Sequence, residues 1–515
     1  MSTSTENLQR AQRPLSLKGL SLEGAAQTKV LVATAIPSTA TAIGVAVFTT
    51  GAPLKSLGFS REQLGAAGFK AAPASTLALP KSKGPALVAV GIGSATDLDV
   101  ARVRDAAAAF ARSVSNQSQL AFSLEGLDDI PTEIAAQAVI EGILLARYEY
   151  AGLGREQKEK SLEGIALVVG DTELDAARAG AIRGLTYAKA TTLARDLANT
   201  PHSHLSATRF AELAVELGEQ KGFEVEVFDK EALQRINCGG LLSVNAGSVE
   251  PPRMIKLVFR PKQKSAASLA LVGKGIMYDS GGISLKPGDS VHARMKNDMS
   301  GAAAVLAAVA ELADLDCPNT VTGYLMCTDN MPSGTATALG DVFTTHGGKT
   351  VEVSNTDAEG RLVMCDALEL AVDERHDAII DIATLTGSCA RALGNDIAGL
   401  FGNDPPLIKQ VEAAARTTGE LVWQLPLHRP YREILQSDVA DLRNCGPVGN
   451  PDALVAALYL AEFVGEVPWA HIDICGTAWN EKDQLWHRAG CSGFGARLLL
   501  ELMTHFTPSA RHARH

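Results

Sequence analysis

Short apolar runs alternate with amphipathic helical patterns along the chain, and this alternation restricts the fold more than any other sequence feature. Strands that alternate with helices pair in parallel, because each helix carries the chain back across the sheet. The first third is predicted to contain four strands and two helices: strands at 29–36, 42–48, 86–90 and 164–170, and helices at 97–114 and 131–150. This part of the chain is therefore expected to form an α/β domain.

One long helical pattern follows at 171–199, ends at Thr200-Pro201, and fits a connector between two domains. A chain of 515 residues is too long for one ordinary core. We predict a smaller N-terminal α/β domain at 1–170, a connecting helix at 171–199, and a larger α/β domain at 200–515 with a mostly parallel central sheet. Expected elements of the larger domain are helices at 206–219, 302–313 and from 362, and strands at 223–228, 255–259, 269–272, 321–327, 378–382 and 470–474.

Composition favours a globular protein outside membranes. Hydrophobic residues make up 46% of the chain and charged residues 20%, which is typical of a packed domain. The net charge of -11 disfavours a broadly basic surface for nucleic acid or lipid. No secretory signal or membrane span is predicted, and the eight unpaired-looking cysteines fit reduced thiols. We expect a cytoplasmic protein, with flexible ends at 1–25 and 511–515.

The most informative stretch is 355–362, Asn-Thr-Asp-Ala-Glu-Gly-Arg-Leu, between a β-rich run at 350–353 and a helical pattern. Such strand-to-helix junctions are where α/β enzymes place their chemistry. If the stretch is extended, Asp357, Glu359 and Arg361 share one face. Taken alone, the two acids are more often part of a solvated loop in which they cap the following helix.

Two further segments carry charges near strand ends. Lys274, Asp279 and Lys286 lie in a glycine-rich segment after the strand at 269–272, and Asp298 precedes a helix rich in small residues. Singly, each has an ordinary explanation: solvated lysines, a turn aspartate and a helix N-cap.

Together, the four acids favour a metal site. Four converging carboxylates cannot all stay ionised without compensation, and two divalent cations would balance their charge. A metal-ligating lysine must be neutral, which a nearby dication enforces. Lys286 and Arg361 would stay cationic and stabilise negative charge that develops on a substrate oxygen.

Other catalytic arrangements are not supported. The chain has no H-E-x-x-H zinc motif and no G-x-S-x-G nucleophile elbow. The Gly91-Ile92-Gly93 run lacks the remaining elements of a nucleotide loop. His346, His376 and His471 are expected to be structural, and the loop with Thr384, Thr386 and Gly387 is either a pocket wall or a helix cap.

These residues resemble the leucyl aminopeptidase (cytosol aminopeptidase) family, M17-type di-metal peptidases, in its bacterial branch. The resemblance rests on 355–362 together with Val272-Gly-Lys-Gly-Ile276 and Asp279-Ser-Gly-Gly282, in that order. It covers the chain from about residue 199 onward. Lys296-Asn297 before Asp298, Ser300 where a glycine is common, and one extra residue between Lys286 and Asp298 depart from the family pattern.

The resemblance implies a metal-dependent aminopeptidase that releases leucine and other mostly apolar N-terminal residues. A tight metal site would use Lys274, Asp279, Asp298 and Glu359, and an exchangeable site Asp279, Asp357 and Glu359. Lys286 and Arg361 match the catalytic positions, with bicarbonate held by Arg361. The metals would be manganese or zinc. Residues near the side-chain pocket would be Met295, Thr384, Thr386, Gly387, Cys475 and Ala478.

The mechanism that follows is attack of a metal-bridging water or hydroxide on the first peptide carbonyl. The family also implies a homohexamer, a dimer of trimers. Two alternatives remain: a di-metal phosphoesterase, and an additional DNA-binding or regulatory role of the oligomer, which the acidic charge disfavours.

Overall fold

A computed structural model describes residues 28–53, 55–80, 83–150 and 161–508. The ends that we expect to be flexible, 1–25 and 511–515, lie outside these residues. The described chain forms two compact units. One contains the residues up to Thr192 with Asn480–Gly490, and the other contains Leu193–Trp479 and the residues from Cys491 onward. The boundaries predicted at 170 and 199 stay a prediction.

The N-terminal unit is built on a six-stranded sheet in the order β1-β6-β5-β2-β4-β3. All neighbouring strands pair in parallel except β3 and β4, which are antiparallel. A core of mostly alanine, leucine and valine side chains packs α4 and α5 against this sheet. The elements are β1 (Lys29–Ala33), β2 (Ala42–Phe48), α3 (Arg61–Ala66), β3 (Thr76–Leu79), β4 (Ala86–Gly93), α4 (Val100–Ser113), β5 (Gln119–Ser123), α5 (Thr132–Ala146) and β6 (Gly164–Val168).

Helix α6 (Leu174–Asn199) leads into the larger unit, which is built on an eight-stranded sheet in the order β15-β14-β17-β13-β9-β10-β8-β7. The four central strands β17, β13, β9 and β10 are parallel, and antiparallel pairs lie toward the edges. The strands are β7 (Glu224–Phe228), β8 (Arg253–Phe259), β9 (Ser268–Asp279), β10 (Thr320–Asn330), β13 (Ala378–Ala383), β14 (Ala398–Gly402), β15 (Val422–Gln424) and β17 (Trp469–Asp473).

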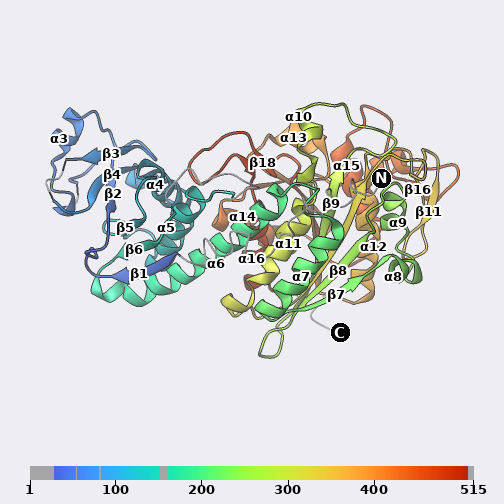
Figure 1. The fold of residues 1–515 in the computed structure, drawn as a ribbon, viewed down its shortest axis with the longest axis horizontal. Coiled ribbons are helices and arrows are strands. Elements are labelled where there is room, and N and C mark those ends of the chain that lie inside the picture. Colours follow the sequence, from blue (N-terminus) through green and yellow to red (C-terminus); the bar gives the residue numbers. More distant parts are fainter. Residues whose placement is uncertain (1–27, 54, 81–82, 151–160, 509–515) are drawn as a thin grey trace, which may run out of the picture. The chain divides into compact units, whose positions relative to one another are not determined.

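Helices cover both faces of this sheet (Figure 1). Helices α7, α11, α14 and α16 form one layer, and α9, α12 and α15 form the other around a core that includes Val272 and Ile379. Their bounds are α7 (Ala207–Lys221), α8 (Lys230–Arg235), α9 (Gly239–Asn245), α10 (Ser290–Ala293), α11 (Ser300–Ala310), α12 (Glu359–Asp373), α13 (Gly387–Leu393), α14 (Pro405–Thr418), α15 (Asp452–Ala461) and α16 (Ala496–His505). The predicted fold class, two α/β domains with a mostly parallel central sheet, is confirmed.

Two small sheets complete the larger unit. One joins β11 (Val342–Thr344), β12 (Thr350–Glu352) and β16 (Leu442–Arg443), and the other pairs β18 (Trp479–Asn480) with β19 (Gly490–Cys491). Among the described residues, no helix combines the length and apolarity needed to cross a bilayer.

Strand β9 is longer than the sequence predicts. The expected strand ends at Val272, where the glycine-rich segment begins, but β9 continues through Gly273 and Gly275 to Asp279. Glycine is needed here because helix α11 lies against the strand: a Cβ on Gly273 would approach Ala302 Cα to 2.7 Å. These glycines therefore mark close packing of a buried strand rather than a loop.

Helix α12 is anchored by a buried carboxylate. Asp366 accepts hydrogen bonds from the backbone N–H of Leu241 (3.1 Å) and of His346 (3.0 Å). Burial raises the pKa of Asp366 to about 7. The protonated carboxyl is thus favoured in the folded chain over a pH range in which the unfolded chain has lost that proton.

This pKa predicts a pH dependence of stability. Between the ordinary pKa of 3.8 and about 7 the folded state holds a proton that the unfolded state does not, so the free energy of unfolding falls as the pH rises across this window. Urea denaturation of the Asp366→Asn variant should show a shallower decline than the parent between pH 4 and 7. Parallel pH profiles for the two proteins would contradict the assignment.

Candidate metal centre

Three buried carboxylates converge beyond the carboxyl ends of the central parallel strands. Asp279 is the last residue of β9, Asp298 lies just before α11, and Glu359 is the first residue of α12. One oxygen atom from each carboxylate lies within 4.8 Å of the others. Within the described part of the chain, this is the group of acidic, histidine or cysteine side chains whose spacing suits a metal ion.

Lys274 lies at the centre of this group. Its Nζ is 2.8 Å from Asp298 Oδ2 and 2.8 Å from Glu359 Oε1, and it donates to the backbone carbonyl of Thr384 at 2.7 Å. Lys274 as a whole residue is only 2% exposed, so its ammonium has no access to bulk water. Burial lowers the pKa of Lys274, but Asp298 and Glu359 outweigh that effect and raise it overall.

Lys286 and Asp357 extend the group toward solvent. Lys286 Nζ is 2.7 Å from Asp279 Oδ2 and 2.6 Å from Asp357 Oδ1. The Asp357 side chain is 34% exposed and Lys286 17%, against 3% for Asp279. The structure thus brings together all five predicted ligand residues and one of the two predicted catalytic residues.

The charges of the cluster are not balanced by protein groups alone. Four carboxylates face two ammonium groups, which leaves an excess of negative charge. Burial, followed by the Glu359 carboxylate, raises the pKa of Asp279 to about 6, and burial also raises the pKa of Asp298 and of Asp357. For Glu359 burial raises the pKa, but Lys274 and Lys286 outweigh it and lower the pKa overall.

The donor set fits divalent cations. Glu359 Oε2 is a buried oxygen that accepts no hydrogen bond from any described residue. A buried acceptor without a donor is unfavourable unless a cation is near, and carboxylate oxygens are the ligands that hard divalent ions prefer. The oxygen-rich cluster is therefore suited to hold metal.

Neither Asp298 nor Asp357 is a helix cap. The residue before α11 is Met299 and the residue before α12 is Ala358, and neither helix has a side-chain cap hydrogen bond. The Asp298 carboxylate instead accepts from Lys274 and from the Thr384 hydroxyl at 2.7 Å. The cap interpretation that the sequence left open is wrong for both residues.

Asp357, Glu359 and Arg361 do not share a face. Helix α12 begins at Glu359, so the alternation of an extended strand ends before Glu359 is reached. The hydrogen-bond partners of Arg361 lie outside the carboxylate cluster: its Nη1 donates to the Asn444 carbonyl at 2.9 Å and its Nη2 to Asp452 Oδ1 at 3.0 Å. Its Nε, which is also buried, has no partner among the described residues.

The loop that carries Asp357 is held by Asn444, which sequence analysis missed. The Asn444 side chain accepts from the N–H groups of Ser354 (2.9 Å) and Asn355 (3.3 Å) and donates to the carbonyls of Asn355 (2.7 Å) and Ala358 (3.3 Å). Asn444 follows β16, which pairs with β12 immediately before this loop. A lone asparagine some ninety residues away in sequence has no local signal of this role.

The predicted pocket residues have different surroundings. Thr384 contacts Asp298 directly. The Thr386 hydroxyl donates to Asp473 Oδ2 at 2.6 Å and accepts from Cys389 N–H, so it caps α13, which begins at Gly387. Asp473 is a second residue that sequence analysis missed; it also accepts from the Leu385 N–H at 3.2 Å.

Three predicted pocket residues lie on two other segments. Met295 is half-buried and Ala478 is buried. Cys475 is half-buried, and burial followed by the Asp473 charge raises its pKa to about 12, so its thiol is protonated at neutral pH. The Cys475 N–H donates to Asp473 Oδ1 at 3.1 Å, so Cys475 shares the carboxylate to which the Thr386 hydroxyl donates.

The three histidines named from the sequence have partners outside the cluster. His346 Nδ1 is 2.6 Å from the Ile236 carbonyl, and His376 Nδ1 is 2.7 Å from Ser268 Oγ. His471 is fully buried, bonds Asp381 through Nδ1 and stacks on Phe401.

Comparison with known proteins decides the family. The model of the cytosol aminopeptidase family, catalytic domain, matches residues 192–500, and that of the N-terminal domain of the same family matches residues 58–157. The chain belongs to the cytosol aminopeptidase family. It is accordingly a metal-dependent aminopeptidase, a hydrolase of the leucyl aminopeptidase type that acts on peptides.

Relatives of this aminopeptidase cover most of its length. A probable cytosol aminopeptidase of Chlorobium limicola is 40% identical over 92% of this chain and 98% of its own. One of Chlorobaculum tepidum is 47% identical over 72% of this chain and 75% of its own. Among solved structures, the bottromycin maturation enzyme BotP in complex with Mn has a TM-score of 0.82 at 36% identity, covering 90% of this chain and 99% of that one.

Gly360 makes room for Lys274 in this aminopeptidase. A Cβ at position 360 would lie 2.7 Å from Lys274 Cε and 2.9 Å from its Nζ. We expect Gly360→Ala to push the lysine away from Asp298 and Glu359 and to lower kcat on leucine p-nitroanilide by about 10- to 100-fold, as loss of a ligand-orienting contact does. Gly334→Ala, where a Cβ meets nothing within 4 Å, is the control. Parental kcat in a folded Gly360→Ala protein would refute this packing argument.

Proposed function

We propose that the enzyme uses two divalent cations, manganese or zinc, to release leucine and other mostly apolar residues from the N-termini of peptides. The convergence of Lys274 with three buried carboxylates carries this proposal. The manganese present in the BotP structure supports an oxygen-rich site of this kind.

The proposed ligands form two sets that differ in how deeply they are buried. Lys274, Asp279, Asp298 and Glu359, all nearly inaccessible, would form the tighter site. Asp279, Asp357 and Glu359, with the Asp357 carbonyl, would form a more exchangeable site, and the greater exposure of Asp357 supports that difference. Asp279 and Glu359 would contribute to both.

When bound, the two cations would supply an activated water and polarise the scissile carbonyl. Lys286 would donate a hydrogen bond to the oxygen of that carbonyl as negative charge develops there. Its partly exposed ammonium, held between Asp279 and Asp357, supports this role because it combines a fixed position with access from solvent. Burial lowers the pKa of Lys286, but Asp279 and Glu359 outweigh that effect and raise the pKa overall, so the group stays protonated.

Arg361 would hold a bicarbonate ion that serves as general base. Two of its donor nitrogens are occupied by Asn444 and Asp452, and the unpartnered Nε supports a remaining capacity for an anion. The N-terminal side chain of the substrate would lie near Met295, Cys475, Ala478 and the loop formed by Thr384, Thr386 and Gly387. We further propose a cytoplasmic homohexamer, a dimer of trimers.

A di-metal phosphoesterase is the alternative chemistry. One variant tests the shared metal ligand, and assays of the parent enzyme on two substrates separate the two chemistries. Glu359→Gln removes a charge from the shared ligand while keeping its shape, so hydrolysis of leucine p-nitroanilide should fall to background in a folded protein. The parent should be inactive on p-nitrophenyl phosphate. Glu352→Gln, at a half-buried residue that accepts from Ser437 Oγ at 2.6 Å outside the cluster, is the matched control and should keep parental turnover.

Either of two results would overturn the proposal. One is parental turnover of the peptide substrate by Glu359→Gln. The other is faster hydrolysis of the phosphate ester than of the anilide by the parent enzyme.

A further inference from the structure

Asn330, the last residue of β10, joins two segments that carry carboxylates of the cluster. Its Nδ2 donates one hydrogen bond to Asp279 Oδ1 at 2.8 Å and another to the backbone carbonyl of Thr356 at 2.9 Å. Thr356 immediately precedes Asp357. Both hydrogens of the amide are thus used, one on each segment.

The main chain of Asn330 is also bound to the end of β9. In the β9–β10 register Asn330 lies opposite Asp279. Its carbonyl accepts from the N–H of Ser280 at 3.0 Å and from the Ser280 hydroxyl at 2.6 Å. The side chain is therefore held from both ends, and at 4% exposure it is shielded from bulk water.

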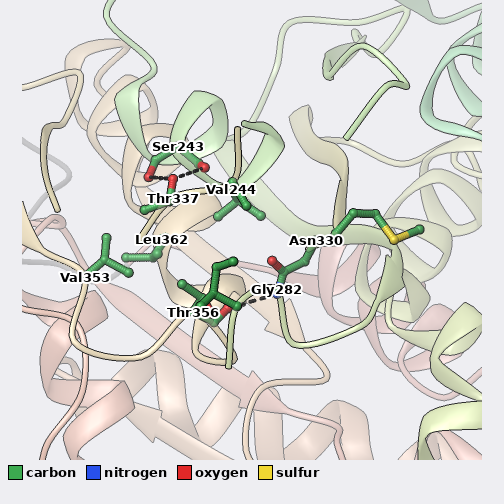
Figure 2. A pocket seen from close by; sticks show the side chains of 11 residues that line it. Ser243, Val244, Gly282, Asn330, Thr337, Val353, Thr356 and Leu362 are labelled. Atoms are coloured by element: carbon green, nitrogen blue, oxygen red, sulfur yellow. Dashed lines mark hydrogen bonds between the residues drawn. The ribbon is translucent and has the colours of Figure 1, made fainter. Parts of the chain in front are cut away.

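The neighbouring glycine fits this arrangement. Gly282 has a φ of +64°, and a Cβ there would lie 2.7 Å from Asn330 Oδ1 and 3.0 Å from Thr356 Oγ1. Figure 2 shows Asn330, Gly282 and Thr356 together beside a small cavity that Ser243 and Thr337 also line. This packing allows the amide one orientation, with Nδ2 toward the carboxylate and Oδ1 toward the glycine.

The consequence is a defined orientation for Asp279. Its Oδ1 accepts from Asn330 and from the Gly281 N–H at 2.9 Å, whereas its Oδ2 faces Lys286 at 2.7 Å. A neutral amide supplies this donor without adding charge to an already negative cluster. An orienting partner of this kind raises the affinity of a ligand for its metal by holding it in place before binding.

We propose that Asn330 is a positioning residue of the metal centre: it orients Asp279 and ties the end of β9 to the Asp357 loop. The inference rests on the two-cation function proposed above, in which Asp279 contributes to both sites. Loss of Asn330 should therefore weaken both bound ions rather than one.

Titration of Mn²⁺ into the chelated full-length protein, followed by calorimetry, tests the role without relying on activity. Asn330→Ala should raise the Mn²⁺ Kd by about 10- to 100-fold. Asn245→Ala is a matched control: Asn245 is equally buried and its Nδ2 also donates twice, to the Glu250 carbonyl (2.8 Å) and to Thr328 Oγ1 (3.0 Å), but it contacts no residue of the cluster. Its Mn²⁺ Kd should stay within about twofold of the parent.

Should Asn330→Ala fail to fold, Asn330→Ser keeps one donor and should give a smaller rise in Kd. A Kd within about twofold of the parent for a folded Asn330 variant overturns the inference and leaves the two-cation function standing. Equal weakening by Asn245→Ala and Asn330→Ala also overturns it, because the effect is then one of general stability. A parent that binds neither Mn²⁺ nor Zn²⁺ overturns the proposed function together with the inference.

Discussion

The ion pairs of Lys274 with Asp298 and Glu359 are the interaction on which the carboxylate cluster of the larger unit depends. Buried charges of one sign are tolerated only when opposite charges and hydrogen bonds compensate them. Without a bound cation, Lys274 supplies one compensating charge deep in the cluster, and Lys286 supplies the other nearer to solvent. As a metal ligand Lys274 would be neutral, and the cation would take over that charge. The remaining negative charge at the strand ends gives the unit its capacity to hold divalent cations.

The charged side chains of the cluster are brought together by close packing of strands and helices rather than by flexible loops. Gly273 lets α11 approach β9, Gly360 leaves room for Lys274, and Gly301 at the start of α11 lies where a Cβ would be 2.2 Å from the Ile382 carbonyl. Small residues thus bring three elements together at the carboxyl ends of the central strands. Polar side chains from distant segments, Asn444 above all, then fix the loop between β12 and α12.

Much of the fold and most of the cluster were predictable from the sequence. The alternation of apolar runs with helical patterns can be recognised from neighbouring residues alone. The predicted bounds of β2 therefore agree with the structure, and those of α6 differ only at its first turn. The acids were recognisable because they stand together in short motifs. The length of β9 was not predictable, because glycine ordinarily argues against a strand. Only the approach of α11 to Gly273 explains why a glycine is needed within this strand. The hydrogen-bond partners of Arg361 depend on where α12 begins. The roles of Asn444 and Asp473 depend on contacts with no local sequence pattern.

We propose that the buried carboxylates hold two metal ions that the reaction requires. The most direct test is to remove all metal with a chelator, add Mn²⁺ back in steps, and measure bound Mn²⁺ per chain alongside hydrolysis of leucine p-nitroanilide. The stripped protein should have no activity, and full activity should return when two ions are bound to each chain. Activity that survives complete chelation would contradict this proposal.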